Sequence, residues 1–178
     1  MDYMDSKKVV EELLEDYLYE PEIARIVGIL DEMGFFTAPA STKYHGAYTG
    51  GLFEHSYEVT KALLNLTNSL QLVWRRRISP VIIGLFHDLV KCQTYKLDPE
   101  TGKYTYRKGA EPGHGEVSVR IADEILSLTD EERQCIRWHM GAYDDKSNWA
   151  PLGEAIEQYP NVLWTHTADM VASKLKGI

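Results

Sequence analysis

The chain has 178 residues, of which 44% are hydrophobic and 26% charged, and its formal net charge is -8. This length and composition predict one globular domain over residues 1–178 that can bury a core without disulfides. The longest uncharged apolar run, VIIGLF, is too short to span a bilayer, and the acidic excess disfavours tight binding to duplex DNA.

The N-terminal segment predicts a helical scaffold with no chemistry of its own. It begins with MDYMDSKK, which is acidic and polar where a signal peptide would be basic and then apolar, so we expect a cytoplasmic protein with reduced cysteines. Apolar residues three and four apart predict a helix over residues 5–19, interrupted by Pro21, and a second helix that ends at Gly34. Residues 1–34 therefore form two N-terminal helices.

The next two helices are expected to form the centre of the fold. After a loop, a third helix should begin near Gly51 and carry His55 on its inward face. A fourth helix should run from Ser79 through Lys91, and it is apolar nearly all round, which predicts burial on every side.

The second half of the chain is expected to add a hairpin and further helices. A short β-hairpin over residues 94–107 is indicated by TYKL and KYTYR, which alternate around the turn DPETG. The capping box TDEE marks the start of a helix at Thr129. The expected helices after the hairpin span 115–128, 129–141, 151–159 and 161–174.

Residue types that bind metals recur through this helical pattern. His87 and Asp88 are adjacent within VIIGLFHDLVK. Neighbouring side chains on a helix diverge by about 100°, so the pair can bind one buried ion only if other helices supply further ligands. Candidates for those ligands are His55, His114, His139 and Asp169. Imidazole and carboxylate without sulfur suit Mn, Fe, Ni, Co or Zn, and Mg is compatible with the oxygen ligands.

This ordered series resembles the HD-domain superfamily of metal-dependent phosphohydrolases over residues 40–175. The run HGAYTGGLFEHS, followed by LFHDLVK, GHGEVS and IRWH, looks most like the branch of 3′ to 5′ exoribonucleases and nucleotide phosphodiesterases. The resemblance implies an all-α helical bundle with a small β-hairpin insertion, whose metal-binding core spans 40–175.

The resemblance also implies one or two divalent ions. It assigns His55, His87, Asp88 and Asp169 to the first ion. It assigns His114 and His139 to a second ion that Asp88 bridges. Without a second ion, the latter two histidines would contact the substrate phosphate instead.

Catalytic and substrate-binding roles follow from the same resemblance. Asp88 would link the metal to the nucleophile, and Lys91, three residues later, would reach a phosphate held by the ion, although it could equally be a solvated lysine. His45 lies in the loop before the paired glycines GG and is a further candidate for substrate binding. His166, one turn before Asp169, is expected to support a ligand or to pack in the core.

The expected function is therefore metal-dependent hydrolysis of a phosphoester in a nucleotide or a short single-stranded oligonucleotide. The rival is a non-catalytic, metal-stabilised HD module that binds a nucleotide or a protein partner. The sequence leaves a homo-oligomer open. A positive rim around the cleft is expected from Lys91, Lys96, Lys103, Arg107 and Lys108.

Overall fold

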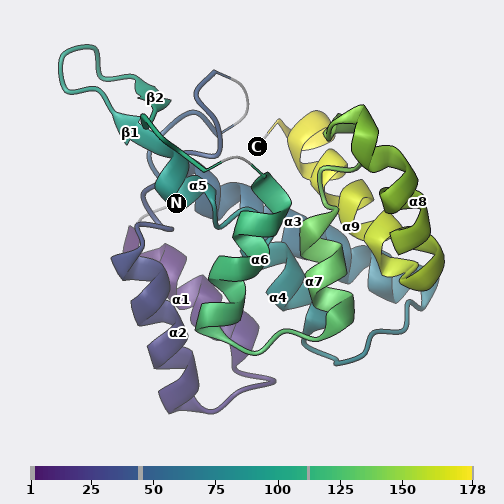
Figure 1. Cartoon of the computed structure of the whole chain (residues 1–178). Helices are drawn as coiled ribbons and strands as arrows, with labels where there is room; N and C mark the ends of the chain where they lie inside the picture. The colour runs from purple at the N-terminus through teal and green to yellow at the C-terminus, as the bar shows by residue number, and fades with distance from the viewer. Residues whose placement is uncertain (1–2, 44–45, 112, 178) are drawn as a thin grey trace.

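A computed structural model describes residues 3–43, 46–111 and 113–177. It shows a bundle of helices with a small β-hairpin that projects at one end (Figure 1), so the expected all-α fold with a hairpin is confirmed. The α-helices are α1 Tyr3–Leu14, α2 Glu20–Glu32, α3 Gly51–Leu70, α4 Ser79–Phe86, α5 Lys91–Thr94, α6 His114–Ile125, α7 Asp130–Arg137, α8 Trp149–Gln158 and α9 Asn161–Met170. The remaining elements are strands β1 Tyr95–Leu97 and β2 Tyr104–Tyr106, the 3₁₀ turns η1 Gly141–Tyr143 and η2 Lys146–Asn148, and the π-helical segment η3 Val171–Lys176.

The N-terminal helices α1 and α2 form a helical hairpin beside the rest of the bundle (Figure 1). Helix α1 ends at Leu14, whereas the periodicity predicted a helix to residue 19. The backbone N–H groups of Tyr17 and Leu18 both donate to the carbonyl of Leu14, which closes a tight turn and reverses the chain. Leu18 still packs against the core from that turn, and for this reason the apolar pattern continues beyond the helix.

Helices α3 and α4 form the centre of the bundle and make the largest contact between any two elements. Every residue of α4 is buried, as its apolar composition predicted. Their close approach depends on Gly84, where an added Cβ would stand 2.4 Å from Oγ1 and 2.6 Å from Cα of Thr60. The glycine therefore brings the end of α4 next to α3.

The fourth helix is shorter than predicted, and this changes the setting of the His-Asp pair. Helix α4 ends at Phe86, and α5 begins at Lys91. In the four residues between them, the backbone N–H of Leu89 donates to Phe86 and that of Lys91 donates to Asp88, a tighter three-residue spacing. His87 and Asp88 thus lie in a turn between two helices.

The β-hairpin predicted over residues 94–107 is present, and its antiparallel register pairs Tyr95 with Tyr106. The hydroxyl of Tyr104 lies 2.8 Å from that of Thr49, so the hairpin is tied to the loop that precedes α3. Helix α7 begins with the predicted capping box between Thr129 and Glu132, but it ends at Arg137 instead of near residue 141. Within the described ranges, none of the helices combines the length and apolarity that crossing a membrane requires.

Candidate metal centre

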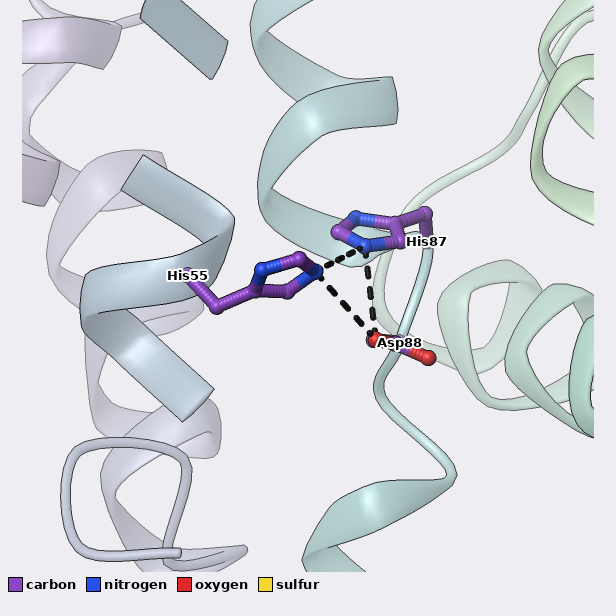
Figure 2. Close-up of side chains that lie close together, drawn as sticks. All are labelled: His55, His87 and Asp88. Carbon is purple, nitrogen blue, oxygen red and sulfur yellow. Dashed lines mark hydrogen bonds and ion pairs between the residues drawn. The ribbon is translucent and has the colours of Figure 1, made fainter. Parts of the chain in front are cut away.

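The first group of candidate ligands comes from α3 and from the turn after α4. Figure 2 shows His55 reaching from α3 toward His87 and Asp88. Nε2 of His55 lies 3.2 Å from Nε2 of His87 and 3.6 Å from Oδ2 of Asp88, and Nε2 of His87 lies 3.4 Å from that oxygen. One potential ligand atom from each residue lies within 4.8 Å of the others, and all three residues are at most 2% exposed. The three atoms could share one ion.

The ring of His87 is held so that a nitrogen lone pair faces this group. Nδ1 lies 2.9 Å from the carbonyl oxygen of Gly84 and donates to it, so the neutral ring carries its lone pair on Nε2. That atom lies 3.4 Å from Oδ2 of Asp88 and within hydrogen-bonding distance of Nε2 of His55, so it could share a cation with both residues. Ligating histidines commonly donate their other ring nitrogen to a carbonyl in this way.

Both carboxylates at the site are ionised. Burial disfavours the charged form of Asp88, but the Lys91 ammonium, 2.5 Å from Oδ2, holds its pKa well below the usual range. Asp169 on α9 places Oδ1 3.2 Å from Nε2 of His55. Burial opposes ionisation of Asp169 as well, yet the contact with His55 holds its pKa below the ordinary value. The site therefore presents two negative charges to a cation.

A second pair of facing acceptors lies on the other side of Asp88. His139 follows α7, and its Nδ1 donates to the carbonyl of Ile136 at 2.7 Å, which leaves the lone pair on Nε2. That atom lies 3.5 Å from Oδ1 of Asp88. Among the described residues neither atom has a hydrogen-bond partner, although both are buried. Two buried acceptors left facing each other are costly, and a bound cation would remove that cost.

His139 occupies a turn after α7, whereas the sequence predicted the last turn of a helix. The backbone N–H of Trp138 donates to Gln134 and that of Gly141 to Trp138, so the regular helix gives way to a tighter turn at this point. His139 is fully buried. Its place beneath the surface favours the predicted metal role over direct contact with substrate.

His114 is the first residue of α6 and lines the cavity described below. Burial, partly offset by the charge of Asp88, lowers its pKa, so the imidazole is neutral near pH 7 and can bind a metal or donate a hydrogen bond. His45, the fourth candidate for substrate binding, lies outside the described residues.

A cavity of about 500 Å³ opens above these ligands. Asp88 and Asp169 reach its surface together with Lys91 and His114, so a substrate in the cavity would contact the candidate metal site directly. The other lining residues are Ala40, Ser41, Thr42, Tyr95, Tyr106, Met140, Tyr143, Met170, Ser173 and Lys174.

Sequence reasoning missed most of the cavity wall. Of the five cations expected at the rim, Lys91 lines the cavity, whereas the others are exposed on and beside the hairpin. The second cation at the cavity is Lys174, near the C-terminal end, whose ammonium lies 5.1 Å from the ring centre of Tyr143. Tyr95 and Tyr106, which pair in the hairpin, both line the cavity. Their positions in the predicted hairpin were the sequence signal that could have indicated an aromatic wall of the cavity.

Comparison with known proteins relates most of the chain to one family of domains. Residues 52–169 match the family model described as HD domain. The chain is 36% identical to dihydroneopterin 2′,3′-cyclic phosphate phosphodiesterase of Methanocaldococcus jannaschii over 176 residues, which are 97% of this chain and 64% of the relative. It is 28% identical to A-adding tRNA nucleotidyltransferase of Deinococcus radiodurans over 125 residues, which are 66% of this chain and 26% of the relative.

The chain thus spans less than two thirds of the length of either relative. No solved structure matches the chain. The family match lies inside the segment 40–175 that was expected to hold the metal-binding core, and it includes every candidate metal ligand.

Proposed function

The chain belongs to the HD-domain family, and from that premise we propose that it is a metal-dependent phosphohydrolase that acts on a phosphoester of a nucleotide or a short oligonucleotide. The observation that carries the proposal is the convergence of buried acceptor atoms at the floor of an open cavity. Nε2 of His87 lies near Oδ2 of Asp88 and Nε2 of His139 lies near Oδ1, so the carboxylate could share one cation with each histidine.

The residues fit one or two divalent ions with nitrogen and oxygen ligands. His55, His87, Asp88 and Asp169 would hold the first ion, and Asp88, His114 and His139 the second. Such donor sets suit Mn, Fe, Ni, Co or Zn, with Mg compatible as well. Ions bound there would lower the pKa of a water molecule and polarise the scissile phosphoryl group.

The chain's own side chains would supply orientation and charge. Asp88 would accept a hydrogen bond from the attacking water and so align it with the phosphorus atom. Lys91, which is paired with Asp88 and faces the cavity, could donate to a phosphate oxygen. With a single ion bound, neutral His114 could donate to the leaving oxygen instead of binding metal. We assign Asp88 and Lys91 to catalysis and Lys91 to phosphate binding, whereas substrate binding by His45, His114 and His139 stays a prediction.

The cavity favours a small substrate that carries a planar ring. Its volume of about 500 Å³ suits a ligand of nucleotide size. Tyr106 and Tyr143, 63% and 60% exposed, present aromatic faces that could stack on a base or a similar heterocycle. The relative that hydrolyses the cyclic phosphate of dihydroneopterin supports the same class, a compact phosphodiester with a fused ring.

Long duplex nucleic acid is not part of the proposal. The chain's net charge of -8 would oppose the many phosphates of a duplex, whereas the described residues that line the cavity include two lysines, Lys91 and Lys174. A single HD domain over residues 1–178 and a cytoplasmic location stay predictions.

Turnover tests the proposal against the rival of a non-catalytic module. Wild-type protein and Asp88→Ala would be incubated with Mn²⁺ and, separately, a chromogenic phosphodiester, a 2′,3′-cyclic nucleotide, a short oligoribonucleotide and duplex DNA. We expect metal-dependent hydrolysis of the small substrates by the wild type alone, and little activity on the duplex. Metal binding with no turnover of any substrate would favour the non-catalytic module.

A further inference from the structure

His166 is placed to control the geometry of His139, a candidate ligand 27 residues earlier in the chain. The imidazole Nδ1 of His166, on α9, lies 2.9 Å from the backbone carbonyl oxygen of His139. Because a carbonyl only accepts, Nδ1 carries the proton and donates it. This bond joins α9 to the turn that carries the buried ligand.

The contact between His166 and that turn is close as well as polar. Gly141 has φ +53°, and a Cβ there would stand 2.4 Å from Nδ1 of His166. The glycine therefore leaves room for the imidazole to lie directly against the turn. A residue with a side chain at 141 would displace the ring and break the hydrogen bond.

The other side of the same turn is held by Arg137. Its guanidinium pairs with Glu116 on α6 and, at 3.2 Å, with Asp144. The turn is thus fixed between α6, which begins with His114, and α9, which carries Asp169. The hydrogen bond from α9 meets the backbone of His139 itself, and so holds the main chain from which the His139 ring, bonded through its Nδ1 to Ile136, projects.

We propose that His166 is a positioning residue for the second ion: its hydrogen bond to the His139 carbonyl directs Nε2 of His139 toward Oδ1 of Asp88. The inference rests on the proposed function, because it assumes that these two atoms hold a cation. Loss of this hydrogen bond lets the turn relax and weakens binding of the second ion, whereas His55, His87 and Asp88 still bind the first. Partners that support a metal ligand typically change metal affinity 10- to 100-fold when removed.

Four variants of the full chain separate this role from general packing. His166→Leu keeps bulk but removes the donor. His166→Asn can place its amide nitrogen near the position of Nδ1, whereas His166→Gln keeps an amide but extends it beyond that position. Thr167→Ala is the matched control, since it removes a hydroxyl bonded to the Leu163 carbonyl on the same helix without touching the turn.

Calorimetric titration of the chelator-treated protein with Mn²⁺ measures how many ions bind and with what affinity. His139→Ala is the reference for loss of the second ion. Wild type, His166→Asn and Thr167→Ala should bind two ions. His166→Leu and His166→Gln should keep the first and bind the second about 10- to 100-fold more weakly. If His166→Leu does not fold, the contrast between the Gln and Asn variants decides.

Three results would overturn the inference. If His139→Ala loses one ion but the Leu and Gln variants bind both ions normally, His166 has no positioning role, and the proposed function stands. If these variants weaken both ions equally, the role is general to the fold. If the wild type binds only one ion, or His139→Ala still binds two, the second-ion assignment in the proposed function fails together with the inference.

Discussion

Replacing Lys91 with methionine separates substrate recognition from metal binding. The ammonium of Lys91 lies 2.5 Å from Oδ2 of Asp88 and reaches the cavity, but it is not itself a metal ligand. Methionine keeps much of the apolar stem and removes the charge. The change therefore tests the role of one cation and leaves every candidate ligand in place.

The expected loss follows from one charge-assisted hydrogen bond to phosphate in a largely buried setting. The Lys91 side chain is 10% exposed, so solvent screens the interaction only weakly. Such a bond contributes about 1 to 3 kcal/mol, which corresponds to a fall in kcat/KM of roughly 5- to 150-fold. Metal affinity should stay at the wild-type level or rise, because the ammonium competes with the ion for Oδ2 of Asp88.

Steady-state kinetics on a 2′,3′-cyclic nucleotide, with metal content measured on the same samples, would test this expectation. Lys96→Met is the matched control, because Lys96 is exposed on β1 and does not line the cavity, and its kinetics should match the wild type. Wild-type kinetics for Lys91→Met, or loss of metal from it, would refute the reasoning.

Three further predictions follow from the same geometry. Saturating Mn²⁺ at 100 times its Kd should raise the wild-type Tm by about 5 to 10 °C, and differential scanning fluorimetry should show no such rise for Asp88→Ala. Gly84→Ala should lower the free energy of unfolding by about 1 to 3 kcal/mol, because its Cβ would meet Thr60; an unchanged denaturation midpoint would contradict this. Tyr106→Ala should raise KM for a nucleotide substrate roughly 5-fold or more through lost stacking, whereas Tyr106→Phe should not, and equal KM values for all three proteins would contradict the aromatic wall.

Helix positions were predictable from the sequence, but helix ends near the site were not. The periodicity correctly indicated α3 with His55 on its inward face, and the all-round apolar pattern of α4 correctly indicated burial. The pattern extended α4 through the His-Asp pair because those residues remain buried. The turn stays buried while its backbone hydrogen bonds change from four-residue to three-residue spacing. The hydrophobic pattern of the sequence does not reveal that change.

The order of the candidate ligands was readable from motifs, whereas the wall of the cavity was not. The series of histidines and aspartates carries a distinctive spacing, and the structure brings His55, His87, Asp88, His139 and Asp169 together. Lys174 and Tyr143 reach the cavity only through packing of the C-terminal segment. A lysine near a helix end and a loop tyrosine have no local pattern that would distinguish them from ordinary surface residues.

The metal content of the purified chain tests the central claim most directly. Elemental analysis would follow chelator treatment and reconstitution with Mn, Fe, Ni and Zn in turn, for the wild type and for His87→Ala. The buried cluster predicts one or two equivalents of at least one of these metals in the wild type and a clear loss in the variant. Metal content near zero in the wild type after all four reconstitutions would contradict the account.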